Sequence, residues 1–388
     1  MVNRKIKVLH ILTRLIGGGA DENTLYTVNG VDKNGFESHL LVGGDSETID
    51  KARSKGIIIL NEKNLVRNIN PFKDLLALFK IIFHIKKGKY NIVHTHTAKA
   101  GFIGRLAAII AGVPIIIHSL HGLSFHDFMP SWQKFFYIVL EKFVGKYTDL
   151  FISVGENIKQ KSIDEGIGDK EKYVTIYSGM DLSKFENISN SKSELRKSLN
   201  IESNELIIGT VVRLEPRKGP QYFVDIIQNI CDQVHDFKAI IVGTGPFEPE
   251  LRTKIEKNNL QDRIVLTGYR KDIAKIMSIF DVICLTSLWE GIPRVLIQGS
   301  KLKKPLLAFD IDGNSEIIKH GINGFLIPPL EFDEFSEALQ KLLNDGELRK
   351  NMSQANENIV DNRWDKDYMC RAIEVEYKKL VKSKLYSR

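Results

Sequence analysis

The sequence predicts an α/β protein made of two doubly wound domains, each built on a parallel sheet. Short apolar runs typical of buried strands alternate with segments of helix length, which is the pattern of βαβ units. This alternation stops near residue 180, crosses a polar stretch at residues 186–197, and then begins again. The chain has 388 residues, which is longer than most single domains and favours two.

We expect a first domain over residues 1–180, a second over residues 181–365, and a C-terminal helix over residues 366–388 that packs back on the first domain. The strands expected in the first half are residues 5–12, 39–42, 56–60, 91–94, 115–118, 150–154 and 174–176, with helices at 21–29 and 100–111. The strands expected in the second half are residues 206–212, 239–242, 264–267, 282–285 and 306–308, with a helix at 221–234.

Three glycines, Gly17, Gly18 and Gly19, follow the first expected strand. Their spacing does not match the G-x-G-x-x-G fingerprint of dinucleotide-binding domains, and no carboxylate clearly ends the second strand. Glycines still allow the backbone to approach a ligand closely. A ligand loop and a simple tight turn therefore both remain open here.

The composition is that of a globular protein, with 43% apolar residues. The N-terminus runs directly into a strand-like segment that is too short for the core of a secretory signal, and the longest apolar runs are too short to cross a membrane. The three cysteines lie far apart and show no metal-binding spacing. These features predict a cytoplasmic protein.

The net charge of +7 lies entirely in the first half, where residues 1–180 carry 24 Lys and Arg against 17 Asp and Glu. Two segments there, residues 71–89 and 131–147, combine apolar side chains at helical spacing with lysines. Their apolar stripes could pack on the sheet or contact a membrane surface. From the basic excess we expect peripheral contact with an anionic membrane at the inner face of the plasma membrane.

The stretch Glu290-Gly-Ile-Pro-Arg-Val-Leu-Ile-Gln298 follows a buried strand, and Pro293 is expected in the first turn of a helix. This arrangement places a carboxylate beside a helix N-terminus at the carboxyl end of a strand, where open α/β sheets bind ligands. Free backbone N–H groups there favour an anion such as a diphosphate. Glu290 is an acceptor suited to sugar hydroxyls.

Two cations, Arg213 and Lys218, follow the first strand of the second half. Fixed positive charge at the end of a sheet suits a diphosphate leaving group, because it stabilises the charge that develops as the bond breaks. Arg213 and Lys218 could take the place of the metal ion that other transferases use, so we expect no metal and no cofactor beyond a nucleotide-sugar co-substrate.

These two constellations resemble the Glu-x(7)-Glu and G-R-x(4)-K-G motifs of the retaining, nucleotide-sugar-dependent glycosyltransferases of family 4, and the resemblance covers nearly the whole chain. It implies the GT-B fold, with two Rossmann-like domains facing across a cleft. It also implies transfer of a hexose or N-acetylhexosamine from a donor such as a UDP-sugar. The second Glu of the motif is Gln298 here, which weakens the expected ribose contact.

The resemblance implies roles for individual residues. Arg213, Lys218 and Glu290 would act at the diphosphate and the donor sugar. Donor-binding positions are expected at Gly18, Gly19, Gly245, Arg270, Ile292, Pro293 and Gln298. His121 would lie near the reacting sugar as a polar contact or proton relay, and His96 and Lys99 would meet the acceptor. The histidine-rich segments from His94 to His126 resemble a bacterial subgroup that builds surface polysaccharides on lipid-linked acceptors.

Three other functions are less consistent with the sequence than this one. Gln298 is compatible with a non-catalytic nucleotide-sugar-binding relative. A two-domain α/β fold is also compatible with an NAD-dependent oxidoreductase. The glycine loop disfavours the oxidoreductase. His94 and His96 share one face of an expected strand, but the histidines lack an H-E-x-x-H motif, so zinc is not expected. Nucleic-acid binding is not expected, because the basic excess belongs to no recognised module.

Overall fold

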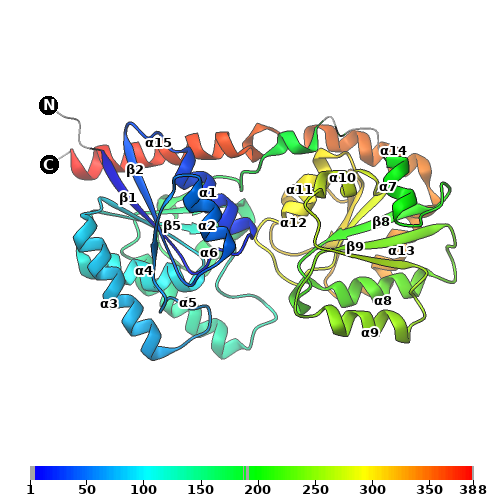
Figure 1. The fold of residues 1–388 in the computed structure, drawn as a ribbon, viewed down its shortest axis with the longest axis horizontal. Coiled ribbons are helices and arrows are strands. Elements are labelled where there is room, and N and C mark those ends of the chain that lie inside the picture. The colour runs from blue at the N-terminus through cyan, green and yellow to red at the C-terminus, as the bar shows by residue number, and fades with distance from the viewer. Residues whose placement is uncertain (1–4, 187, 189–191, 387–388) are drawn as a thin grey trace. The chain divides into compact units, whose positions relative to one another are not determined.

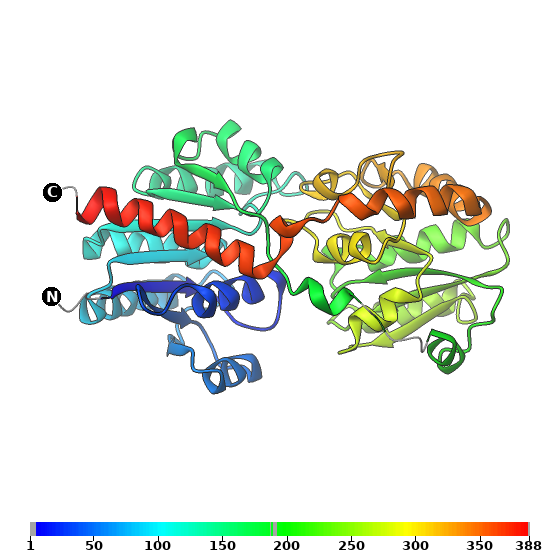
Figure 2. The same cartoon turned by 90° about the horizontal axis from the view of Figure 1, so that it is seen from above.

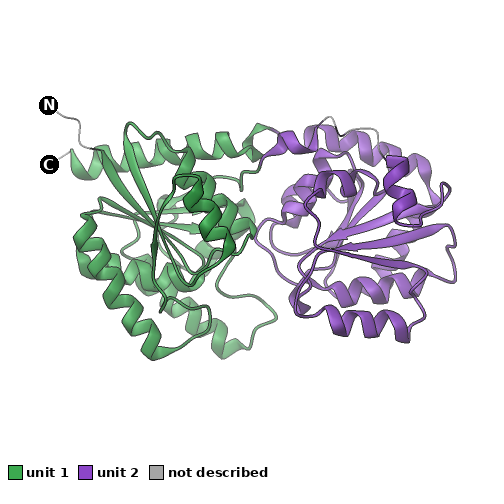
Figure 3. Ribbon diagram, viewed as in Figure 1, with its two compact units in different colours: residues 1–180, 362–388 green, residues 181–361 purple. Residues whose placement is uncertain are grey.

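The structure is a computed structural model that describes residues 5–186, 188 and 192–386. The chain divides into two compact units (Figure 3): Met1–Met180 with Asn362–Arg388 form unit 1, and Asp181–Asp361 form unit 2. The boundary at which the chain returns from unit 2 to unit 1 lies after Asp361, four residues before the boundary expected after residue 365. Both units have the parallel, doubly wound topology that the sequence predicts.

Unit 1 contains a parallel sheet with the strand order β3-β2-β1-β4-β5-β6-β7. Its strands are β1 (Ile6–Leu12), β2 (Phe36–Val42), β3 (Ile58–Asn61), β4 (Ile92–His96), β5 (Ile115–Leu120), β6 (Leu150–Ser153) and β7 (Tyr173–Thr175). Its first helices are α1 (Gly19–Gly30), α2 (Glu47–Ser54), α3 (Pro71–Gly88), α4 (Ala98–Ala111), α5 (Ser131–Gly145) and α6 (Glu156–Asp164) (Figure 1). Both faces of the sheet are covered, as parallel sheets require.

The last helix of the chain, α15 (Lys366–Leu385), belongs to unit 1. Its buried side chains Met369, Ile373 and Tyr377 share a core cluster with Val8 of β1 and Ile92 of β4. Both Figure 1 and Figure 2 show α15, in red, alongside this sheet. Consecutive residues of β1 point to opposite faces, so Leu9 enters the other cluster, beneath α3 and α4.

Unit 2 contains a parallel sheet with the strand order β10-β9-β8-β11-β12-β13. Its strands are β8 (Leu206–Val211), β9 (Phe237–Val242), β10 (Ile264–Gly268), β11 (Val282–Leu285), β12 (Leu306–Phe309) and β13 (Gly324–Ile327). Its helices are α7 (Lys192–Ser198), α8 (Pro220–Ile230), α9 (Glu248–Lys257), α10 (Ile273–Ser278), α11 (Arg294–Lys301), α12 (Asn314–Ile317), α13 (Phe332–Asn344) and α14 (Gly346–Ala355).

The direction of winding reverses once in each sheet. The reversal falls between β1 and β4 in unit 1 and between β8 and β11 in unit 2. At such a switch point the connections leave to opposite faces, which opens a crevice at the carboxyl ends of the strands. The loops that follow these four strands carry most of the residues singled out from the sequence.

Candidate active site

Lys218 and Glu290 meet at the switch point of unit 2. Lys218 follows β8 and Glu290 follows β11, and the Lys218 Nζ donates a hydrogen bond to Glu290 Oε1 at 2.5 Å. The side chains are 17% and 10% exposed, so this ion pair is largely shielded from water but still accessible. The structure thus brings together two residues that the sequence assigned to one site from separate motifs.

A close approach of two loops holds this pair in place. Gly219 has a φ of +66°, and a Cβ at this position would lie 1.9 Å from the carbonyl oxygen of Thr286. The Thr286 hydroxyl donates to the Gly219 carbonyl at 2.8 Å, and the Leu288 N–H donates to the Arg217 carbonyl at 3.0 Å. Only glycine satisfies both the backbone conformation and the space available.

A third loop, which follows β12, supports Glu290 from the other side. The backbone N–H of Glu290 donates to Asp312 Oδ2 at 2.9 Å. A Cβ at Gly313 would lie 2.6 Å from the carbonyl oxygen of Gly291, so the two loops pack backbone against backbone. Asp312 therefore anchors the main chain at Glu290.

Pro293 does not begin the helix that follows. It is the N-cap residue, with an extended ψ of 113°, and α11 begins at Arg294. The expectation of Pro293 in the first helical turn was therefore wrong by one residue. Ile292 is 8% exposed and packs inward, and Gln298 is half-buried on α11.

Arg213 lies two residues beyond β8 and pairs with a carboxylate that was not predicted. Arg213 Nε lies 3.0 Å from Glu215 Oε1, and Arg217 Nε lies 3.0 Å from Glu215 Oε2. The side chain of Arg213 is 44% exposed. The spacing in the sequence could have indicated these two ion pairs, because Glu215 is two positions away from both Arg213 and Arg217.

The remaining predicted donor positions lie in loops after β9 and β10. A Cβ at Gly245 would lie 2.2 Å from the Leu214 carbonyl oxygen, so this glycine permits contact between the loops that follow β8 and β9. Arg270 forms a two-point contact with Asp272, with Nε–Oδ1 and Nη2–Oδ2 distances of 2.8 and 2.5 Å. This contact lowers the pKa of the Asp272 carboxyl group.

The glycine loop of unit 1 is occupied by a side chain of its own helix. Asp21 Oδ2 accepts hydrogen bonds from the N–H groups of Ile16, Gly17 and Gly18 at 2.8, 2.9 and 3.0 Å. Burial raises the pKa of Asp21, while the three N–H donors act in the opposite direction. Gly18 is the N-cap and Gly19 the first residue of α1, so the carboxylate satisfies an N–H group that was expected to face a ligand.

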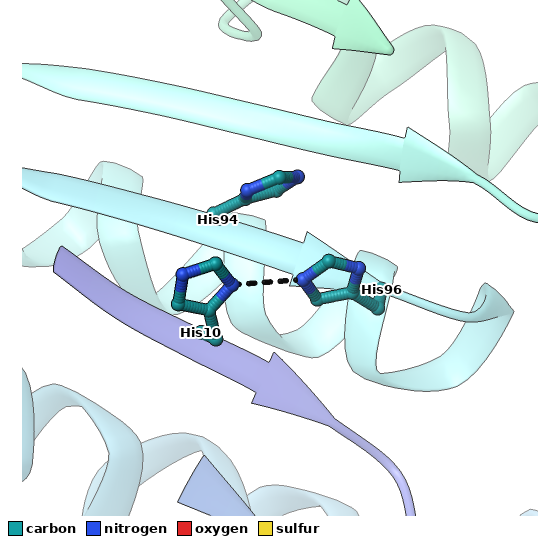
Figure 4. Close-up of side chains that lie close together, drawn as sticks. All are labelled: His10, His94 and His96. Atoms are coloured by element: carbon teal, nitrogen blue, oxygen red, sulfur yellow. Dashed lines mark hydrogen bonds between the residues drawn. The ribbon is translucent and has the colours of Figure 1, made fainter. Parts of the chain in front are cut away.

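His121 follows β5 and is linked to two buried histidines. His96 Nδ1 lies 3.0 Å from His121 Nε2, and His96 Nε2 lies 3.1 Å from His10 Nδ1 (Figure 4 shows the second bond). His96 is 1% exposed and uses both ring nitrogens within the protein, so it does not present the direct acceptor contact expected from the sequence. Lys99 Nζ lies 2.5 Å from Asp74 Oδ1.

Within the described residues, the group with the geometry to approach a metal ion is His10, His94 and His96, whose nearest ring nitrogens lie within 4.8 Å of one another. His94, however, already uses both nitrogens: Nδ1 lies 2.6 Å from the Tyr377 hydroxyl and Nε2 lies 2.8 Å from the Ser119 hydroxyl. The sequence paired His94 with His96 but missed His10, which enters this group because β1 and β4 are neighbours.

Solved structures share this architecture. The structure of HepE from Anabaena in complex with UDP has a TM-score of 0.80 at 22% identity, covering 97% of this chain and all of that one. The structure of WaaG, a glycosyltransferase involved in lipopolysaccharide biosynthesis, has a TM-score of 0.76 at 15% identity, covering 94% and 99%. These likenesses, with two doubly wound sheets, establish the GT-B fold of the glycosyltransferases.

The family follows from comparison of sequences. The model for Glycosyl transferases group 1 matches residues 191–359, and that for Glycosyltransferase Family 4 matches residues 17–184. The UDP-Gal:alpha-D-GlcNAc-diphosphoundecaprenol alpha-1,3-galactosyltransferase of Escherichia coli is 32% identical, over 88% of this chain and 89% of its own. The capsular polysaccharide biosynthesis glycosyltransferase CapM of Staphylococcus aureus is 25% identical, over 81% and 84%. The chain belongs to glycosyltransferase family 4, which confirms the family predicted from the sequence.

Proposed function

We propose that this enzyme transfers a hexose or N-acetylhexosamine from a UDP-sugar to a lipid-linked saccharide, with retention of configuration, during synthesis of a surface polysaccharide. The observation that carries this proposal is the Lys218–Glu290 pair at the switch point of unit 2. The printed activity of the Escherichia coli relative, a galactosyl transfer to a lipid-linked acceptor, supports the choice of donor and acceptor classes.

An exchange of partners would prepare the site for the donor. In the structure each cation of the predicted diphosphate clamp is held by a carboxylate, Lys218 by Glu290 and Arg213 by Glu215. A donor diphosphate would compete for both cations, because it carries more negative charge than one carboxylate. Glu290 would then accept hydrogen bonds from donor-sugar hydroxyls. The carboxylates keep the cations oriented until the donor arrives.

The two cations would supply the electrostatic stabilisation that the reaction needs. Negative charge grows on the diphosphate as the bond to the sugar breaks, and positive groups already in place lower that barrier. We propose that Arg213 and Lys218 fill the role that a metal ion has in other transferases. The departing diphosphate oxygen takes the proton of the acceptor hydroxyl on the same face of the sugar, so no enzyme nucleophile takes part.

Membrane contact is a further part of the proposal. Within the described residues, none of the helices combines the length and apolar character needed to cross a bilayer. The helices α3 and α5 both pack on α4, so they cover the same face of the sheet. Their large apolar side chains point outward and define an aromatic face: Phe72, Leu75, Leu76, Phe79, Phe83, Trp132, Phe135, Phe136, Val139 and Phe143.

The aromatic face suits the surface of an anionic bilayer. Phe72 is 84% exposed and Trp132 is 70% exposed, whereas each helix turns smaller or aliphatic residues such as Ala77 and Ile138 to the core. Exposed lysines flank it, among them Lys86, Lys87, Lys142 and Lys146. Aromatic rings would enter the interface while the lysines attract anionic headgroups. Such contact would place the enzyme at the inner face of the plasma membrane, beside a lipid-linked acceptor.

The decisive experiment measures sugar transfer by Lys218→Ala and Glu290→Ala variants. Each should lose about a hundredfold to a thousandfold in kcat, because each removes a charged contact to the reacting centre. Lys254→Ala is the matched control, since Lys254 forms an ion pair of similar length with Asp225 elsewhere in unit 2, at 2.6 Å. Wild-type rates in both site variants would contradict the assigned roles.

A further inference from the structure

A hydrogen-bonded series of three histidines runs through unit 1 to the residue expected near the reacting sugar. His10 on β1, His96 on β4 and His121 after β5 are linked by Nδ1–Nε2 contacts of 3.1 and 3.0 Å. His10 and His96 are 0% and 1% exposed. The three come from separate segments, so the series exists only in the folded sheet.

The two buried imidazoles are neutral. Burial lowers the pKa of His10 to about 3 and holds the pKa of His96 well below its ordinary value. A neutral imidazole carries one ring proton, so it donates through one nitrogen and accepts through the other. His96 uses both nitrogens in the series, and its tautomer therefore sets the direction of both hydrogen bonds.

Only two arrangements satisfy both bonds, and they differ at the buried end. In the first, His10 Nδ1–H donates to His96, which donates through Nδ1–H to His121 Nε2. In the second, His121 Nε2–H donates to His96, which donates to His10 Nδ1, and the proton of His10 then lies on its Nε2. Within the described residues, His10 Nε2 is buried and has no hydrogen-bond partner. The second arrangement therefore leaves a buried N–H donor unsatisfied, which proteins rarely tolerate.

We propose that His10 and His96 are positioning residues that hold His121 as the Nδ1–H tautomer. This inference rests on the proposed function for the meaning of His121, which the family resemblance leads us to expect near the reacting sugar. An Nδ1–H presents a hydrogen-bond donor to an oxygen of the substrate and leaves no basic nitrogen at that position. The acceptor proton then goes to the departing diphosphate oxygen and not to His121.

The same atoms suggest a rival, a buried metal ion held by His10, His94 and His96. The hydrogen bonds of His94 argue against it, because Tyr377 and Ser119 already engage both of its nitrogens at 2.6 and 2.8 Å. A metal ion would have to displace at least one of these bonds. Metal content is therefore one of the outcomes that the experiment measures.

The experiment is ¹⁵N NMR of the full chain labelled at histidine, with His121 assigned by the loss of its signals in His121→Asn. The expected spectrum has a protonated Nδ1 and an unprotonated Nε2 at His121. His10→Asp should introduce the Nε2–H form, because a carboxylate at position 10 accepts from His96 Nε2–H and leaves His96 Nδ1 to accept from His121. His10→Asn, whose amide nitrogen can take the place of Nδ1–H, should keep the wild-type spectrum. His118→Leu is the control, because His118 is buried in the same sheet but bonds to Thr95.

The kinetics give a second readout. His10→Asp should lower kcat about tenfold with the donor KM unchanged, and His10→Asn should retain most of the wild-type kcat. A wild-type His121 with a protonated Nε2, an unchanged spectrum in His10→Asp, or stoichiometric bound zinc would overturn the proposal. The wild-type spectrum decides the matter even where a variant does not fold. If the chain shows the expected spectrum but transfers no sugar, the proposed function is contradicted and the assignment of the His121 tautomer is not.

Discussion

Gly219 and Thr286 are in backbone contact, and the site depends on that contact. A Cβ on Gly219 would lie 1.9 Å from the Thr286 carbonyl oxygen, and Gly219 has a φ of +66°. The two residues connect the loop of Lys218 to the loop of Glu290. Any side chain at position 219 would push these loops apart, and the ion pair would separate with them.

Gly219→Ala should lower the free energy of unfolding by about 3 kcal/mol, because strain from a positive φ adds to overpacking. Gly321→Ala is the matched control. Gly321 has a φ of +76° with nothing within 4 Å of its Cβ position, so only the backbone strain of about 1 kcal/mol applies. Urea unfolding of both variants measures the difference. Equal losses would show that the loop contact contributes nothing.

Gln298→Glu should raise the affinity for UDP about fivefold. A carboxylate accepts a hydrogen bond from a ribose hydroxyl more strongly than an amide does, by about 1 kcal/mol. Calorimetric titration with UDP measures the change. Sugar transfer by the wild-type chain, measured alongside, excludes the non-catalytic relative that Gln298 suggests. An unchanged affinity would mean that position 298 does not meet the ribose.

Stability should rise between about pH 8 and pH 10.5 because of Lys304. Burial lowers the pKa of Lys304 from 10.5 to about 8 in the folded protein, where its Nζ donates to the Ser278 carbonyl at 2.9 Å. Across that interval the unfolded chain holds a proton that the folded chain has lost, so raising the pH favours folding. In Lys304→Met this part of the rise should vanish. Urea unfolding at pH 7.5 and pH 9.5 gives the change in the free energy of unfolding for both proteins. An identical change in the wild type and in Lys304→Met would contradict the lowered pKa of Lys304.

Replacing Phe72, Phe79, Trp132 and Phe135 by Ser should abolish sedimentation with anionic liposomes and leave the fold intact, because these side chains are 61–84% exposed. Ile322→Ser is the control, since Ile322 is a 60% exposed apolar residue of unit 2. Binding of the wild type should weaken at high salt and with neutral lipid. Equal sedimentation with neutral and anionic vesicles would show that the lysines do not contribute to membrane binding through anionic headgroups.

Features with a local physical cause could be predicted from the sequence. Asn70 accepts from the Lys73 N–H and caps α3, which is an ordinary role for asparagine, and the buried strands coincide with the apolar runs. Lys218 and Glu290 could be paired because strand-end residues of one parallel sheet share an edge. These inferences need only periodicity, capping chemistry and the rule for switch points.

Other features required the folded chain. The sequence showed apolar stripes on residues 71–89 and 131–147 but could not show which part of each stripe faces the sheet, since both helices are apolar over much of their circumference. The glycines after β1 could have formed a ligand loop or a tight turn, and only the folded chain shows that Asp21 accepts from the N–H groups of this loop. His10 lies 86 positions before His96, and only strand pairing makes them neighbours.

The position of α15 has a consequence for synthesis of the chain. Met369, Ile373 and Tyr377 complete the core of unit 1 alongside Val8 and Ile92, so this core remains incomplete until α15 has left the ribosome. Unit 2, which is continuous in sequence from Asp181 to Asp361, contains all of its own strands before that moment. Unit 2 is therefore able to fold during translation before unit 1 does, although most of unit 1 is synthesised first. This order is the reverse of the usual one, in which the N-terminal domain folds first.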